Sequence, residues 1–390
     1  MKRRSYRRST LTAHAGLHAP LPDARPHAPP LYQTTAFEYD DAASAEEAAQ
    51  GKKLIYTRDA SPTENTLAQA VAALECAEAA RVFSSGMGAI AAGLEAFVSQ
   101  GDHIATVHGL YGGTQELLAG VLTRFGVRYT LAAEPTAKSL EAIVEPSTKV
   151  VYVESISNPL LRVAELDAIG ALCRARGIAL IVDATFATPL LQRPLQHGAT
   201  LSIHSATKYM SGHGDAMCGT VAGSTEALAR VHKLRKFHGA NCDPFAAWLV
   251  LRGLRTLTLR VERQVANAGI IAEALVELSS VERVWYPGLA SHPDRAVAAR
   301  VLDGAGAMVS FEVKGGLDGA RRVYDRLGLI GRAASLGDVT SLMTHPARFS
   351  HVGISAEDRR AAGIADGLLR LSVGIEDAQD LVDDLREALG

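Results

Sequence analysis

The fold is decided by the stretch IALIVDATFATPLLQRPLQHGATLSIHSATK, which spans residues 178–208. Two short apolar runs of strand character lie in it, Ile178–Val182 and Leu201–Ile203, and a polar segment follows each run. Similar runs occur earlier at Ile104–Val107 and Val150–Val153, with helix-like stretches between them. Alternating strands and helices predict an α/β fold with a mostly parallel sheet sandwiched by helices.

Two chemically informative residues follow these runs. Asp183 ends the first, and a carboxylate at a buried strand end is costly unless a cation or hydrogen bonds compensate it. A pyridinium nitrogen is one such cation, and Asp183 would keep it protonated so that the ring can accept electrons. Lys208 follows the second run beside Ser205 and Thr207, where desolvation would make its amine nucleophilic. Ligands collect beyond the carboxyl ends of parallel strands, so we expect both residues at one site. The alternatives are helix capping for Asp183 and a surface position for Lys208.

A glycine turn lies upstream of this stretch. Val82 and Phe83 have strand character and lead into Ser84–Ala89, which reads SSGMGA. Small residues and backbone N–H groups at the start of a helix suit a phosphate. The spacing departs from the dinucleotide and P-loop fingerprints, so a simple chain reversal is the alternative.

The length of 390 residues predicts two domains. We expect an extended, proline-rich arm over residues 1–60, the sheet domain over residues 61–257, and a smaller α+β domain over residues 258–390. Three features support the last: a helix pattern at Val261–Leu275, an alternating strand at Val309–Val313, and a final helix from Asp377.

Composition excludes several functional classes. The formal net charge of -2 predicts no nucleic-acid partner, although the first residues are basic. No apolar stretch resembles a signal peptide or reaches membrane-spanning length, so we expect a cytoplasmic protein without a membrane partner.

The cysteines and histidines are expected to be structural. The four cysteines lie far apart, which predicts reduced, buried thiols rather than a disulfide scaffold. These cysteines are Cys76, Cys173, Cys218 and Cys242. His204, His213 and Asp215 could be read as metal ligands, but their spacing matches no standard signature, so no metal is expected.

Taken together, the motifs resemble the Cys/Met-metabolism pyridoxal-phosphate enzymes, which include cystathionine γ-synthases, cystathionine γ-lyases and methionine γ-lyases. The resemblance covers nearly the whole chain. Its motifs are PPLYQT (29–34), YTR (56–58), SSGM (84–87), LYGGT (110–114), ESISNP (154–159), DATFATP (183–189), SATKY (205–209), SLG (335–337) and RLSVG (370–374).

The resemblance implies a fold like that of aspartate aminotransferase and pyridoxal 5'-phosphate as the cofactor. Lys208 would hold the cofactor as a Schiff base, Asp183 would pair with its ring nitrogen, and Tyr111 would stack on the ring and assist the leaving group. Further cofactor contacts are implied for Gly86, Met87, Asn158, Ser205 and Thr207.

Other residues are implied to bind the substrate or the neighbouring chain. Arg370, with Ser335 and Asn158 near it, would take the α-carboxylate of an amino acid. Tyr56 and Arg58 would reach the phosphate in a neighbouring subunit, which implies shared active sites in a homo-oligomer, commonly a homotetramer.

The implied reaction is γ-elimination from a sulfur amino acid through quinonoid and vinylglycine intermediates, with release of 2-oxobutyrate, ammonia and a thiol. The alternative is γ-replacement by a cystathionine γ-synthase or an O-acylhomoserine sulfhydrylase, and a more remote one is a non-catalytic cofactor-binding relative. Asp338 and the segment His345–Ala347 favour a lyase or sulfhydrylase. Gly113 stands where methionine γ-lyases typically carry a cysteine, and Thr340 where many cystathionine-processing members carry an acidic residue.

Overall fold

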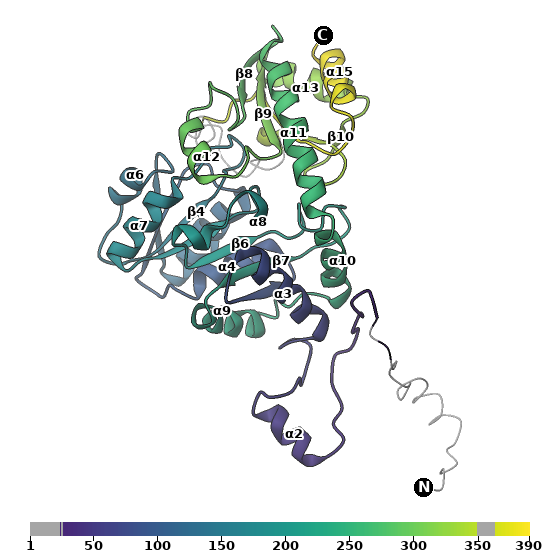
Figure 1. The fold of residues 1–390 in the computed structure, drawn as a ribbon. Coiled ribbons are helices and arrows are strands. Elements are labelled where there is room, and N and C mark those ends of the chain that lie inside the picture. Colours follow the sequence, from purple (N-terminus) through teal and green to yellow (C-terminus); the bar gives the residue numbers. More distant parts are fainter. Residues whose placement is uncertain (1–23, 25, 349–362) are drawn as a thin grey trace. The chain divides into compact units, whose positions relative to one another are not determined.

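The structure is a computed structural model that describes residue 24 and residues 26–348 and 363–390. The chain divides into two compact units, Met1–Pro30 and Leu31–Gly390. The second unit contains every helix and strand named below (Figure 1).

A seven-stranded sheet forms the centre of this unit, with strand order β1-β7-β6-β5-β4-β2-β3. The pairs formed among strands β2 to β6 are all parallel, and β7 is antiparallel to both of its neighbours, β1 and β6. The strands are β1 (Ala79–Phe83), β2 (His103–Val107), β3 (Arg128–Ala132), β4 (Thr148–Glu154), β5 (Ala179–Asp183), β6 (Leu201–His204) and β7 (Gly219–Gly223).

Helices cover both faces of this sheet. Consecutive strand residues point to opposite faces, and the two neighbours Val221 and Ala222 of β7 join different hydrophobic clusters. Val221 packs in a cluster with residues of α4 (Gly86–Glu95) and α9 (Thr225–His238), whereas Ala222 packs in one with residues of α3 (Pro62–Glu75) and α10 (Pro244–Leu254). The expected sandwich of helices around a mostly parallel sheet is therefore present.

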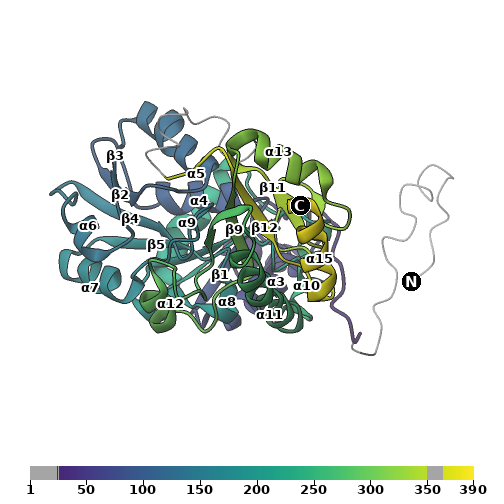
Figure 2. The ribbon, with the colours of Figure 1, turned by 90° about the horizontal axis from the view of Figure 1, so that it is seen from above.

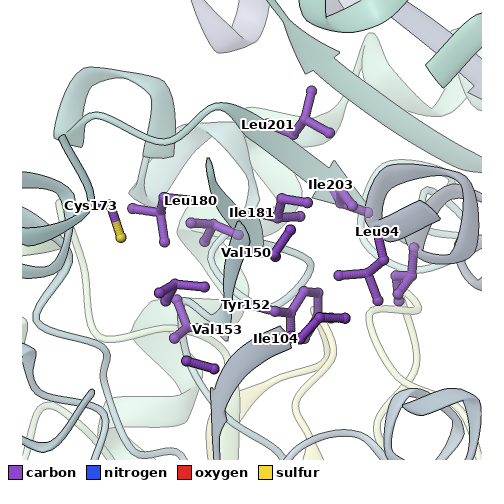
Figure 3. Close-up of a cluster of buried hydrophobic side chains, with 14 of the residues drawn as sticks. Leu94, Ile104, Val150, Tyr152, Val153, Cys173, Leu180, Ile181, Leu201 and Ile203 are labelled. Atoms are coloured by element: carbon purple, nitrogen blue, oxygen red, sulfur yellow. The ribbon is translucent and has the colours of Figure 1, made fainter. Parts of the chain in front are cut away.

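The main core lies where the middle strands meet these helices. Side chains of β2, β4, β5 and β6 converge with Leu94 of α4 and with Cys173 of α7 (Leu166–Arg176), as Figure 3 shows. Strands buried on both faces read as continuous apolar runs, which is why these strands were visible in the sequence. Packing in this core fixes the positions of the strand ends, which carry the polar residues described below.

A second, five-stranded sheet has the order β10-β11-β12-β9-β8 and is mostly antiparallel. The helices α11, α13 and α15 pack beside it (Figure 2). Its elements are α11 (Leu257–Val276), β8 (Val281–Trp285), α12 (Arg295–Val301), β9 (Met308–Val313), α13 (Gly316–Arg326), β10 (Gly331–Arg332), β11 (Leu342–Thr344), β12 (Leu368–Ser372) and α15 (Ala378–Leu389).

Shorter elements complete the unit. They are α2 (Ala42–Ala49), α5 (Gly112–Glu116), η1 (Leu117–Val121), η2 (Leu122–Phe125), α6 (Ala137–Glu141), α8 (Thr188–Leu191), η3 (Pro194–His197) and η4 (Pro346–Arg348). The two C-terminal helices expected from the sequence are present, and Asp377 caps the last one by accepting from the N–H of Gln379 at 2.8 Å.

Three expectations were wrong. The segment before residue 60 contains a regular helix, α2, because the prolines end at Pro30 and Asp41 caps an alanine-rich run. Cys76 is exposed, because the helix α3 ends at that residue in a left-handed conformation with φ of 54°. The strand β9 does not alternate between core and solvent: five of its six residues are buried, and Ser310 on its second face donates to the carbonyl oxygen of Pro159 at 2.6 Å.

No helix in the described part of the chain is long and apolar enough to cross a membrane. The division at residues 60 and 257 stays a prediction, although the two sheets lie on either side of residue 257.

Candidate active site

A cavity of about 250 Å³ opens at the carboxyl ends of β4, β5 and β6. Parallel strands end at the same edge of a sheet, so the residues that follow them gather there. The cavity is lined by Ser85, Gly86, Met87, Ile90, Tyr111, Glu154, Ile156, Asn158, Asp183, Thr185, Phe186, Ser205, Thr207, Lys208, Met217, Ala334, Leu336 and Arg370. Nine of the twelve site residues expected from the sequence are in this set.

Asp183 is the last residue of β5 and is buried. One of its oxygens, Oδ1, accepts from the backbone N–H of Thr185 at 2.9 Å. Burial raises the pKa of this carboxyl, because the charged form loses its hydration, and the hydrogen bonds to Thr185 only partly oppose that effect. A cation placed in the cavity against Asp183 would restore the ionised form.

Lys208 lies in the turn after β6, and its Nζ donates to Ser335 Oγ at 3.3 Å. Ser335 is thereby brought to the cavity although its own surface does not line it. Burial lowers the pKa of Lys208, and the nearby charge of Arg370 lowers it further. Both effects favour a neutral amine, which is the nucleophilic and basic form.

A cradle for an anion lies at the start of α4. Ser85 caps this helix, and its Oγ accepts from the N–H of Gly88 at 3.0 Å. Glycine is required at position 86, because a Cβ there would lie only 2.7 Å from Ser205 Cβ. Thr207 is fixed beside the cradle by Cys218, whose N–H donates to Thr207 Oγ1 at 2.9 Å. The backbone N–H groups at this helix start and the hydroxyl of Ser205 fit a phosphate dianion, while the hydroxyl of Thr207 donates to the carbonyl oxygen of Cys218 at 3.1 Å in this structure.

Arg370 lies in the middle of β12, which pairs with both β11 and β9. It is buried, and its Nη1 donates to Asn158 Oδ1 at 2.6 Å. Its Nε has no hydrogen-bond partner among the described residues. Burial lowers the pKa of Arg370 to about 10. A buried guanidinium with a free N–H fits a carboxylate, which it binds through two parallel hydrogen bonds.

Tyr111 and Asn158 are both tied to Glu154, the last residue of β4. Glu154 Oε1 accepts from the N–H of Tyr111 at 2.6 Å, and Oε2 accepts from the N–H of Asn158 at 3.2 Å. Burial and, to a smaller extent, the neighbouring Asp183 raise the pKa of Glu154 to about 8. Tyr111 lines the cavity and remains 43% exposed as a residue.

Tyr56 and Arg58 do not join the cavity within one chain. The guanidinium carbon of Arg58 lies 5.5 Å from the centroid of the Tyr56 ring, and both residues line a separate depression with Gly239 and residues 241–244. Their expected role in a neighbouring subunit stays a prediction.

Sequence reasoning missed several residues of the cavity. The most important of these is Glu154. It ends an apolar run just as Asp183 does, so the cost of a buried carboxylate at a strand end could have identified it too. Thr185 was also missed, and its Oγ1 accepts from the N–H of Ser205 at 2.8 Å. The apolar wall formed by Ile156, Phe186 and Leu336 carried no signal, because such residues are ordinary core residues in a sequence.

The residues considered as metal ligands are engaged elsewhere. His204 Nε2 lies 2.5 Å from Glu75 Oε1, and His213 Nδ1 lies 2.6 Å from the carbonyl oxygen of Ser211. Asp215 accepts from the hydroxyl of Ser211 at 3.1 Å. No group of three or more His, Cys, Asp or Glu side chains in the described ranges could hold a metal ion.

Comparison with known proteins places this geometry in a family. The model of the Cys/Met metabolism PLP-dependent enzymes matches residues 9–390. The chain belongs to this family. Its cofactor is therefore pyridoxal 5'-phosphate, it is an enzyme, and the resemblance seen in the motifs is confirmed.

Relatives in the family carry out several reactions. An L-methionine gamma-lyase of Pseudomonas putida is 42% identical, with 93% of this chain and 92% of that protein covered. An O-succinylhomoserine sulfhydrylase of Pseudomonas aeruginosa is 40% identical over 93% of this chain and 91% of that protein. A crystal structure of cystathionine gamma synthase from Xanthomonas oryzae pv. oryzae has a TM-score of 0.88 and 40% identity, with 93% and 92% of the two chains covered. The expected α/β fold class is thereby confirmed.

The residues present fit the cofactor of the family. The anion cradle at Gly86 suits its phosphate, and the buried carboxylate of Asp183 suits a positively charged ring nitrogen. Lys208 offers a desolvated amine to its aldehyde. The charge of Asp183 contributes to the raised pKa of Glu154, so a positive charge opposite Asp183 would lessen that effect and favour the ionised form of Glu154.

Proposed function

We propose that the chain catalyses γ-elimination from a sulfur amino acid and releases 2-oxobutyrate, ammonia and a thiol. The observation that carries the proposal is the convergence of Lys208, Asp183, Tyr111 and Arg370 on one largely apolar cavity. These are the groups that the reaction requires: an amine to carry the cofactor and move protons, a counter-ion, an aromatic face and a carboxylate receptor.

Each residue has a separate task in this proposal. Arg370 and Asn158 hold the α-carboxylate of the amino acid and so fix the direction of its Cα–H bond. The pyridine ring, when bound against Asp183, supplies an electron sink for the charge left when that proton leaves. Lys208 takes the proton, since burial favours its neutral amine, and Ser335 orients the Nζ atom by accepting from it.

The later steps also fall to residues of this chain. Once Lys208 has passed on the first proton it takes a second from Cβ, and the electron pair left there forms the Cβ–Cγ double bond as the Cγ–S bond breaks. The hydroxyl of Tyr111 is assigned to protonate the departing sulfur. Lys208 can then return a proton to the carbon chain, and a water molecule is consumed when ammonia and 2-oxobutyrate are released. The apolar side chains of Ile156, Phe186 and Leu336 limit the access of water to the reacting carbon atoms. Gly86, Met87, Ser205 and Thr207 are assigned to the phosphate.

Methionine is the substrate that the cavity favours. Among the described residues that line it, the cationic ones are Lys208 and Arg370, and both are already assigned. Cystathionine carries a second carboxylate and a second ammonium group, which would need polar partners at the far end of the cavity. The methyl thioether of methionine needs only apolar contacts.

The second candidate is γ-replacement, in which a thiol enters instead of leaving. It is supported by the activities of two relatives that are about as similar to this chain, a sulfhydrylase and a cystathionine gamma synthase. The two reactions share their early steps, so the residues of the cofactor site serve both.

We also propose that two or more copies share their active sites. Support comes from the exposed Tyr56 and Arg58, which lie outside the cavity of their own chain and could reach a phosphate in another. A homotetramer in the cytoplasm is the assembly and location expected from the resemblance and from the dispersed, unpaired cysteines.

The decisive experiment is a product profile. Purified protein loaded with pyridoxal 5'-phosphate is given methionine, cystathionine, homocysteine or O-acetylhomoserine, with and without an added thiol. Release of 2-oxobutyrate from methionine without the thiol supports the lyase. Formation of a thioether that depends on the thiol, without 2-oxobutyrate, identifies a γ-replacement enzyme and overturns the proposal.

A further inference from the structure

Glu154 is a buried carboxylate in the cavity to which neither the motif comparison nor the proposed reaction gives a task. It is 7% exposed and directly opposite Asp183 in the pairing of β4 with β5. A buried carboxylate beside a second one costs free energy unless hydrogen bonds or a cation compensate it. Its contacts show what it does in the structure.

The two oxygens of Glu154 hold two different loops. Oε1 accepts from the N–H of Tyr111 at 2.6 Å, at the start of α5. Oε2 accepts from the N–H of Asn158 at 3.2 Å, four residues further along the chain. The side chain therefore ties the loop after β2 to the loop after β4 in the described structure.

The contact to Asn158 continues to the substrate receptor. Asn158 Oδ1 accepts from Arg370 Nη1 at 2.6 Å, and Arg370 comes from the other sheet. This is the one hydrogen bond to the Arg370 side chain that is found among the described residues. Glu154, Asn158 and Arg370 thus form a continuous chain from the strand end to the guanidinium.

Ionised Glu154 suits this arrangement. A carboxylate only accepts, and both of its oxygens here face backbone donors. An amide in its place would accept at one oxygen and would oppose the other N–H with a donor of its own. No other described side chain accepts from the N–H of Tyr111 or of Asn158, so the loss would not be compensated.

We propose that Glu154 is a positioning residue that holds Tyr111 and, through Asn158, Arg370 in the orientation that binds the substrate. This inference rests on the proposed function, which assigns the α-carboxylate to Arg370. It adds a residue outside the groups that touch substrate or cofactor in that scheme.

The test is a binding measurement on the variant Glu154→Gln. The probe is L-norleucine, which has the shape of methionine but no γ-leaving group, so that binding is read without turnover from the visible absorption of the loaded enzyme. We expect the dissociation constant to rise about tenfold, with the absorption band of the bound cofactor retained. With methionine we expect KM to rise and kcat to fall, because Arg370 and Tyr111 are both displaced.

A double-mutant cycle identifies the route of the effect. Asn158→Ala should weaken norleucine binding by a similar factor, and the double variant should bind little worse than either single variant, because both interrupt the same chain of contacts. Independent, multiplying losses would contradict the route through Asn158.

Glu64→Gln is the matched control. Glu64 is also a buried carboxylate, but it accepts from Arg235 and from the N–H of Cys242, away from the cavity. We expect the control to melt at a lower temperature and to bind norleucine within about twofold of the wild type. If Glu154→Gln does not fold, Glu154→Asp carries the test, since it withdraws both acceptors by one methylene while keeping the charge.

The outcomes separate the two proposals. Unchanged norleucine binding in a folded Glu154 variant overturns the positioning role, whatever the enzyme makes from methionine. If the wild type binds norleucine but releases no 2-oxobutyrate from any sulfur amino acid, the proposed γ-elimination is wrong. The positioning role of Glu154 is then decided by the norleucine dissociation constants alone.

Discussion

Glu154 and Asp183 are paired residues of the adjacent parallel strands β4 and β5, and both carboxylates are buried at the same edge of the sheet. Burial raises the pKa of both carboxyl groups, and the charge of Asp183 raises that of Glu154 further. Two acids in such a place predict a site that is completed by a positive charge.

The pH dependence of the cofactor-free protein follows from this pair. The pKa of Glu154 rises from 4.5 to about 8, so between these values the folded protein holds a proton that the unfolded chain has lost. Stability should therefore fall as the pH rises through this range, by an amount on the order of 4 kcal/mol. Melting temperatures of the cofactor-free wild type and of Glu154→Gln, measured across the range, check this. Parallel curves would contradict it.

Gly86→Ala should weaken cofactor binding by about tenfold or more, because a Cβ at this position would lie 2.7 Å from Ser205 Cβ and would open the phosphate cradle. The dissociation constant of pyridoxal 5'-phosphate is the measurement. Gly120→Ala is the control, since a Cβ there meets no atom within 4 Å. Equal affinities in the two variants would count against the cradle.

Gly113→Cys should lower kcat with little change in cofactor affinity. A Cβ at position 113 would lie 2.7 Å from Cε1 of Tyr111 and 3.1 Å from Sδ of Met87, so the tyrosine ring must move. We expect a loss of about tenfold in kcat for methionine, as for a displaced acid–base group. An unchanged or higher kcat would show that the ring can occupy another productive position.

Arg370→Lys should raise KM for methionine by about tenfold to a hundredfold, because an ammonium group cannot reproduce the paired hydrogen bonds of a guanidinium to a carboxylate. The visible band of the cofactor should persist, since Lys208 and Asp183 are untouched. Steady-state kinetics with the absorption spectrum check both points. A KM near that of the wild type would contradict the assignment of Arg370 as the residue that binds the α-carboxylate.

Most strands of the large sheet could be predicted from the sequence because of the way they are buried. Strands β2, β4, β5 and β6 are buried on both faces and therefore appear as apolar runs, and a polar residue that ends such a run stands out, as Asp183 does. Strand β7, with the sequence GTVAG, was missed because glycine and alanine pack closely against β1 and β6 and give no apolar run.

The site could be predicted less completely, because its connections are long in sequence. Arg370 meets Asn158 across 212 residues, and Lys208 meets Ser335 across 127 residues. No periodic pattern encodes such contacts, and the motifs indicated only that the residues belong together. Glu154 ends an apolar run as Asp183 does and could have been found by the same argument, but its partners, two backbone N–H groups, could not be read from the sequence.

The most direct test of the account is the amount of 2-oxobutyrate formed from methionine by the loaded wild type and by Lys208→Ala. The account predicts that the wild type forms equal amounts of 2-oxobutyrate, ammonia and methanethiol. In Lys208→Ala the rate should fall by about a hundredfold or more, and the absorption band of the lysine-bound cofactor should disappear. Elimination that survives in Lys208→Ala, or a wild type that consumes no sulfur amino acid, would contradict it.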